Sequence, residues 1–234
     1  EFRRVLFRSD LLVQALQGIS MYAHRAALFG LRNREVDIFT LEALFTTVTN
    51  VNFDPDRVGE MIRKSVTIRE KAKQTYMEAC QNKGQSLETF NGPSTWIPAT
   101  DINGLIQQGQ TVSILNRLKS QGEDITSLQE LLTYGLKGAA AYADHAQILG
   151  KEDDSIYAFM HEALNFLTKT NPTVDELISM NLRCGEISVK VLELLDSANT
   201  GTYGQQTPAQ VLMGHIPGKA IAVSGHDLKD LEEL

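Results

Sequence analysis

One histidine in this sequence stands where a metal ligand would be expected. His226 lies between Gly225 and Asp227, directly after residues 219–224, which form a short and almost continuously apolar run. Such a run is typical of a buried parallel strand, and α/β folds gather ligands at the carboxyl ends of their strands. A neutral imidazole there can bind a transition metal while a carboxylate or a carbonyl holds its second nitrogen. A single histidine is not a site, however, and a capping or packing role would also explain it.

The other reactive or metal-binding side chains show no such placement. Cys80 has no second cysteine within three residues, so neither a redox pair nor a metal motif is indicated. His215 stands in a loop between Gly214 and Pro217 and carries no spacing signal. The sequence has no phosphate-binding loop, nucleophile elbow or two-histidine metal motif. We therefore predict no catalytic residue in this chain.

Composition and charge indicate a globular protein without a nucleic-acid or membrane partner. The chain has 234 residues, of which 42% are hydrophobic and 22% charged, and its formal net charge is −7 without any basic block. No apolar run approaches the ~20 residues that a membrane-spanning helix needs. Two cysteines are no disulfide framework and fit a reducing cytosol. We therefore expect a cytoplasmic protein.

The elements that would position these side chains are duplicated. A helical pattern near the start of the chain returns 120 positions later, which predicts two similar helical units. The matching positions are Leu11 and Leu131, Leu12 and Leu132, Leu16 and Leu136, Gly18 and Gly138, Tyr22 and Tyr142, Ala23 and Ala143, Ala26 and Ala146, Gly30 and Gly150, Phe39 and Phe159, Glu42 and Glu162, Ala43 and Ala163, and Leu44 and Leu164.

Apolar periodicity and capping residues predict three helices in each unit. In the first unit they cover about residues 10–29, 35–51 and 55–80. Residues 81–126 form a connector with a short helix near 107–119. In the second unit a capping box at 127–130 opens the first helix, and the others cover about 153–168 and 173–197. A glycine-punctuated loop at 199–204 follows.

The predicted fold is therefore mainly α: two duplicated three-helix bundles, followed by the first strand and helix of an α/β (Rossmann-like) domain. We divide the chain into bundle 1 at 10–80, the connector at 81–126, bundle 2 at 127–198 and the start of a truncated α/β domain at 199–234. In that last segment Asp227 is the expected N-cap of a helix that starts at Leu228. Residues 1–9 are basic in an acidic protein and lack an initiator methionine, so we interpret them as a non-native end.

The repeat also gives plain explanations for several polar side chains. Cys184 corresponds to Ser65, which indicates a small core residue. His24 corresponds to Asp144, and His145 to Arg25, which indicates solvated polar faces. His161 corresponds to Leu41 and is expected at the boundary of the core. Glu42 and Glu162 occupy equivalent places on separate bundles, so they are not expected to pair.

Three segments carry a resemblance to a known family: Leu131–Gly150, Asp196–Gly204 and Val223–Leu231. They resemble the hybrid-cluster (prismane) protein family, whose activity is hydroxylamine reduction. The resemblance implies two helical bundles followed by two α/β domains. It also implies a [4Fe-4S] cluster held by four cysteines near the N-terminus. A second, hybrid iron–sulfur–oxygen cluster would be held by a histidine, glutamates and several cysteines. His226 aligns with that histidine, which makes it the expected metal and cofactor ligand.

The resemblance further implies two-electron reduction of hydroxylamine to ammonia and water, with nitric oxide as a further substrate of some members and a separate redox protein as the electron donor. This chain departs from the family pattern, because residues 1–9 contain no cysteine and the other hybrid-cluster ligands would lie beyond Leu234. We therefore expect a piece of a longer protein that is inactive alone. Two alternatives stay open: a relative of the nickel carbon monoxide dehydrogenases, and a non-catalytic helical scaffold that binds a partner.

Overall fold

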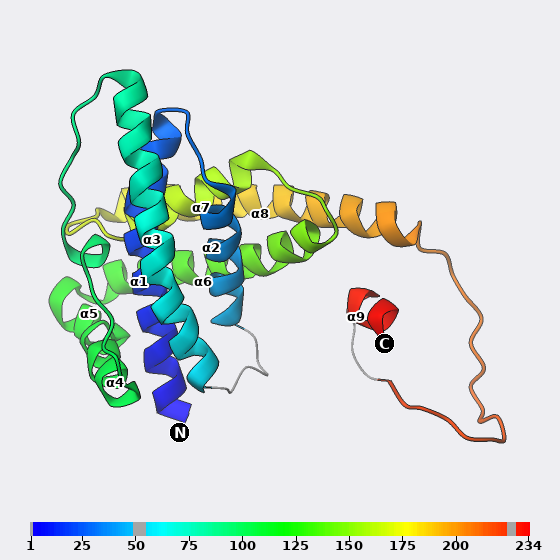
Figure 1. Cartoon of the computed structure of the whole chain (residues 1–234). Coiled ribbons are helices and arrows are strands. Elements are labelled where there is room, and N and C mark those ends of the chain that lie inside the picture. The colour runs from blue at the N-terminus through cyan, green and yellow to red at the C-terminus, as the bar shows by residue number, and fades with distance from the viewer. Residues whose placement is uncertain (1, 49–54, 224–227) are drawn as a thin grey trace. The chain divides into compact units, whose positions relative to one another are not determined.

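The computed structural model describes residues 2–48, 55–223 and 228–234. Its contacts divide the chain into two units, residues 1–204 and 205–234, which are described separately below. Throughout the described ranges the regular structure is helical and no strand is found, which confirms the prediction of a mainly α fold. The first unit contains α1 (Phe2–Leu28), α2 (Arg34–Thr46), α3 (Pro55–Lys83), the 3-10 helix η1 (Gly92–Ser94), α4 (Ile102–Thr111), α5 (Ile114–Gln121), α6 (Glu123–Ile148), α7 (Asp154–Phe166) and α8 (Val174–Tyr203) (Figure 1).

The ends of the helices repeat along with their apolar faces. Gly30 and Gly150 follow the first helix of each repeat with φ of 86° and 79°, a left-handed conformation that glycine adopts without strain. The middle helices are then capped by side chains at equivalent positions. Asn33 Oδ1 accepts from the Glu35 backbone N–H at 3.1 Å, and Asp153 Oδ1 accepts from the Ser155 backbone N–H at 2.8 Å.

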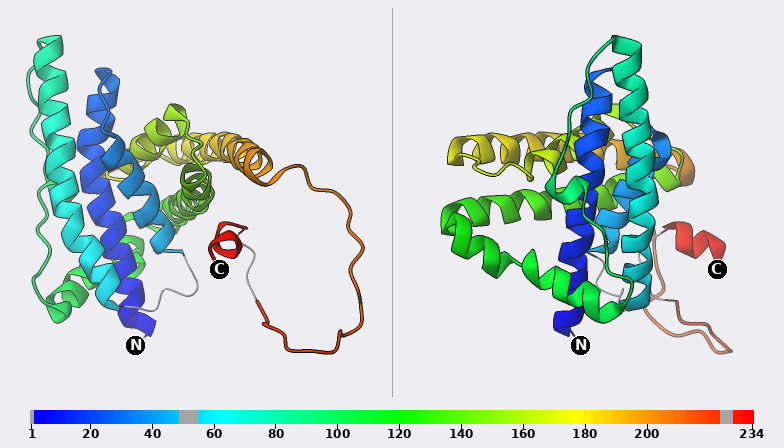
Figure 2. Two further views of the ribbon diagram at one scale, coloured as in Figure 1. Left: turned by 45° about the vertical axis from the view of Figure 1, so that its right-hand side comes forward. Right: turned by 60° about the vertical axis from the view of Figure 1, so that its left-hand side comes forward.

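The two repeats exchange their middle helices. Within each repeat the first and third helices pack together, α1 with α3 and α6 with α8. The middle helices pack mainly on the other repeat instead, α2 on α6 and α7 on α1. Figure 2 shows α1 and α3 side by side, with α6 and α8 running across them. A single hydrophobic cluster contains residues of both repeats, so the two repeats share one core, and the domain boundaries given above stay a prediction.

Three local predictions differ from the structure. The first helix of the second repeat begins at Glu123 rather than at a capping box, because Gly122 at φ 86° already breaks the chain there. The connector carries two short helices, α4 and α5, where one was predicted. The predicted loop at 199–204 is the last turn of α8, which Gly204 ends at φ 87°. Thr200 is part of this turn, and its hydroxyl donates to the Asp196 carbonyl at 2.7 Å.

The second unit contains α9 (Leu228–Glu233) and a long segment without regular structure. Residues 219–223, predicted to form the first strand of an α/β domain, are exposed and form no strand. A parallel strand needs a neighbour for its hydrogen bonds, and this chain offers no second apolar run of the same kind. The predicted N-cap Asp227 lies outside the described residues. No helix in the described part of the chain is long and apolar enough to cross a membrane.

Candidate functional site

The predicted metal ligand, His226, lies outside the described residues. Within the described ranges, no group of three His, Cys, Asp or Glu side chains is arranged to hold a metal ion. The two cysteines are both buried and free, Cys80 at the end of α3 and Cys184 in the middle of α8. Iron–sulfur clusters are held mainly by cysteine thiolates. The described residues alone therefore do not fit such a cluster.

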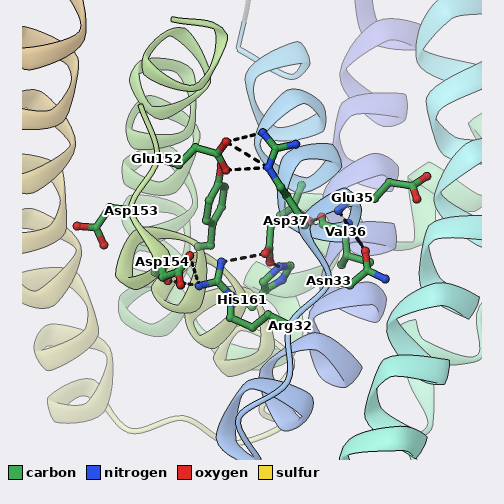
Figure 3. A network of polar contacts seen from close by, with 12 residues as sticks. Arg32, Asn33, Glu35, Val36, Asp37, Glu152, Asp153, Asp154 and His161 are labelled. Carbon is green, nitrogen blue, oxygen red and sulfur yellow. Dashed lines mark hydrogen bonds and ion pairs between the residues drawn. The ribbon is translucent and has the colours of Figure 1, made fainter. Parts of the chain in front are cut away.

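A buried polar network lies instead where α1, α2 and α7 meet. His161 of α7 is 3% exposed, and its Nδ1 lies 2.9 Å from the hydroxyl of Ser20 on α1. Its Nε2 lies 3.0 Å from Oδ1 of Asp37 on α2 (Figure 3). With the proton on Nε2, the ring donates to Asp37 and accepts from the Ser20 hydroxyl. Both nitrogens are thus satisfied inside the core.

The network reaches the surface through an arginine. Arg32 donates to Asp37 Oδ2 at 2.8 Å and pairs with Asp154 at 2.9 Å across the two repeats (Figure 3). Burial would raise the pKa of Asp37, but the hydrogen bond from His161 and the charge and hydrogen bond of Arg32 outweigh burial, so that this pKa lies below its usual value. Asp37 is therefore a stable carboxylate inside the core.

Beside it, a second ion pair joins the start of α2 to the residues just before α7. Arg34 forms an ion pair with Glu152, which also accepts from the Tyr157 hydroxyl at 2.9 Å. Burial and then the Glu152 carboxylate raise the pKa of Tyr157. Arg32 corresponds to Glu152 in the repeat, and Arg34 corresponds to Asp154. The ion pairs are crossed: Arg32 pairs with Asp154, the equivalent of Arg34, and Arg34 pairs with Glu152, the equivalent of Arg32. Complementary charges thus fix how the two repeats dock.

The serine–histidine–aspartate arrangement does not act as a nucleophilic site. Ser20 is 0% exposed, and the adjoining cavity, lined by Arg32, Asp37 and His161 among others, has a volume of only about 10 Å³. That volume accommodates about one water molecule. No substrate carbonyl can reach the hydroxyl, so the network holds α7 against α1 and α2 rather than performing chemistry. That this chain contains no catalytic residue stays a prediction.

This network was not predicted from the sequence. His161 was expected at the boundary of the core because its repeat partner is Leu41, and it is in fact buried and hydrogen-bonded at both nitrogens. Its partners Ser20 and Asp37 are 141 and 124 positions away. One signal was available: Ser20 on α1 and Asp37 on α2 stand at helical positions that face the hydrophobic core, where a polar residue needs a partner.

The positions predicted as solvated polar faces are also partly different. Asp144 is 6% exposed, its Oδ1 has no hydrogen-bond partner, and burial together with nearby Glu42 raises its pKa to about 6. The prediction was wrong for this residue because α2 of the other repeat covers it. Its repeat partner His24 is half-buried, and burial lowers its pKa despite nearby Glu162. Glu42 and Glu162 face these different partners and do not pair with each other.

Comparison with known proteins covers nearly the whole chain. Residues 4–234 match the family model described as "Prismane/CO dehydrogenase family". A hydroxylamine reductase of Rhodospirillum rubrum is 51% identical over 225 residues, which are 96% of this chain and 41% of that protein. Hydroxylamine reductases of Methanocella arvoryzae and Syntrophobacter fumaroxidans are 44% and 46% identical, again over 96% of this chain and 41% of theirs. The chain thus spans about two fifths of the length of these curated relatives.

Proposed function

The chain belongs to the Prismane/CO dehydrogenase family, and from this membership we propose that it forms the helical part of an iron–sulfur oxidoreductase that reduces hydroxylamine. The observation that carries the proposal is the similarity to curated hydroxylamine reductases, 51% identical in one case, over almost all of the chain. The proposed reaction consumes hydroxylamine, two electrons and two protons and yields ammonia and water. A separate redox protein in the cytoplasm would supply the electrons.

In this proposal the described helices are a scaffold. Three of their buried polar side chains serve to join the repeats, since Ser20, His161 and Asp37 satisfy one another away from solvent. His226 is the one residue of this chain that we assign to metal binding, as a ligand of the hybrid iron–sulfur–oxygen cluster. The other ligands of that cluster, and the cysteines of the [4Fe-4S] cluster, would come from parts of the protein that this chain does not span.

The family description also includes carbon monoxide dehydrogenase, which makes that activity the second candidate. The names of the relatives favour the first, because those that match most of this chain are hydroxylamine reductases. A scaffold without any enzymatic partner explains the helices equally well. It does not explain why the similarity continues to residue 234.

The test is turnover by the longer protein recovered with its complete reading frame. Purified without oxygen and given reduced methyl viologen, it should oxidise the dye when hydroxylamine is added and release ammonia in a ratio of two dye molecules per ammonia. Residues 1–234 alone should do neither. A complete protein that reduces the oxidised dye with carbon monoxide but does not turn over hydroxylamine, or that shows no turnover at all, would contradict the proposal.

A further inference from the structure

In the first repeat, the outer groove between α1 and α3 is covered by the connector. Leu105 of α4 is completely buried and lies over Gly59 of α3, where an added Cβ would come 3.8 Å from its side chain. At Gly18 of α1 the backbone of Pro93 approaches so closely that a Cβ would lie 2.2 Å from its carbonyl oxygen. Further along, Phe90 packs edge-on against Tyr22 with 5.2 Å between the ring centroids.

In the second repeat, the equivalent groove between α6 and α8 is bare in the described structure of residues 2–48 and 55–204. Gly138 corresponds to Gly18, and a Cβ added there would meet nothing within 4 Å. Leu131 is 59% exposed where its partner Leu11 is 0% exposed, and Tyr142 is 50% exposed where Tyr22 is 7% exposed. The same helical pattern is thus buried by a covering segment in one repeat and left open to solvent in the other.

The open groove has the character of a binding surface. It encloses about 440 Å³ and is lined by apolar or uncharged side chains, among them Leu131, Ile178 and Leu182, with Cys184 and Gly185 also along it. Leu182 is 66% exposed. Contiguous exposed apolar patches are typical of interaction sites and ligand-binding grooves. Cys184 also lines the groove but is only 5% exposed, so it lies at the bottom of the groove.

We propose that the α6–α8 groove is the docking surface for an amphipathic helix supplied by the part of the longer family protein that this chain does not span. The shape of the occupant follows from the first repeat, where a ten-residue helix, α4, does the same with one buried leucine and a buried glycine one turn later, Gly109. The source follows from length, because the relatives are more than twice as long as this chain. The inference rests on the proposal that this chain is part of such a longer protein.

Hydroxyl-radical footprinting tests the proposal without requiring activity. Oxidation rates of Leu131 and Leu182 are measured by mass spectrometry in residues 1–234 and in the complete protein. Exposed Leu115 of α5 serves as the accessible control and buried Leu136 as the protected one. Both groove leucines should react like Leu115 in the short chain and about tenfold more slowly in the complete protein, in proportion to lost exposure. Equal rates in both would overturn the proposal.

A substitution separates docking from other causes of protection. Leu182→Asp should leave the unfolding midpoint of residues 1–234 unchanged and lower that of the complete protein, while Leu115→Asp lowers neither. If groove leucines are protected already in the short chain and become reactive on dilution, a second copy is the occupant and the proposal is wrong. If the complete protein lacks iron and turnover but protects both leucines, the proposed function fails and the docking surface stands.

Discussion

Replacing Asp144 by asparagine should stabilise the protein at neutral pH and leave it unchanged in acid. Asp144 lies between α6 and α2, is 6% exposed and has an oxygen without a hydrogen-bond partner. Burial and nearby Glu42 raise its pKa from 3.8 to about 6. The folded state therefore holds this proton more tightly than the unfolded state. Its contribution to stability is complete below pH 3.8 and is lost as the pH rises through about 6.

The size of the effect follows from the two pKa values. A difference of this size corresponds to about 3 kcal/mol, an upper limit because local opening admits water to the carboxylate. The asparagine side chain introduced by Asp144→Asn carries no charge at any pH. We expect the variant to be about 1–3 kcal/mol more stable than the wild type at pH 8, and to match it near pH 4.

Urea unfolding followed by circular dichroism between pH 4 and pH 8 measures both proteins. The matched control is Asp196→Asn, which removes a carboxylate from an exposed position on α8, and should alter the pH dependence little. Glu42→Gln should reduce the pH dependence without abolishing it, because burial is the larger cause. If Asp144→Asn is less stable than the wild type at pH 8 as well as at pH 4, the carboxylate has a stabilising partner and the reasoning fails.

Four further variants test how the repeats are joined and how their grooves are covered. Ser20→Ala should lower the free energy of unfolding by about 1–3 kcal/mol, because His161 Nδ1 loses its only described partner inside the core; an unchanged urea midpoint would show that water replaces the hydroxyl. Arg32→Met should lower it by about 2 kcal/mol at pH 7 through loss of a charge-assisted bond to Asp37. That difference should shrink as the pH falls below 3.8, because the stability that comes from the lowered pKa of Asp37 is complete above pH 3.8 and is lost as the pH falls through the lower pKa of the folded state. A difference independent of pH would assign the loss to packing. Gly18→Ala should destabilise by roughly 1–3 kcal/mol because the new Cβ meets the Pro93 backbone, whereas Gly138→Ala, its repeat equivalent in open space, should be neutral or stabilise by up to about 1 kcal/mol. Thermal unfolding of the two glycine variants side by side checks this pair, and equal midpoints would contradict the difference between the grooves.

The features predicted well from the sequence are those encoded within a few residues. The third helix of the second repeat begins at Thr173 as predicted, and Glu176 N–H donates to Thr173 Oγ1 at 3.2 Å. The apolar stripe of the first helix, including Leu12 and Leu16, is buried as its spacing indicates. Local signals failed where a loop signal and a helix signal overlapped. At Gly201 the helix continues, because a single glycine within a helix lowers its stability by only about 1 kcal/mol.

The exchange of middle helices was not predictable from either repeat alone. The apolar faces of α2 and α7 predict that these helices are buried, but not whether they pack against α1 or against α6. The information lies in pairs far apart, such as Arg34 with Glu152 and Asp37 with His161. A repeat alignment treats these positions as equivalents of Asp154, Arg32, Tyr157 and Leu41, which conceals that they meet. Burial of His161 and Asp144 follows from that exchange, and both were therefore misplaced.

We propose that His226 binds the iron centre of a hydroxylamine-reducing enzyme, and the iron content of the complete protein with and without that imidazole tests this assignment most directly. His226→Ala, purified without oxygen, should lose the electron paramagnetic resonance signal of the hybrid cluster and part of the bound iron. The control His215→Ala removes an exposed imidazole from the preceding segment and should keep both at the wild-type level. Unchanged iron and an unchanged signal in the His226 variant would contradict the assignment.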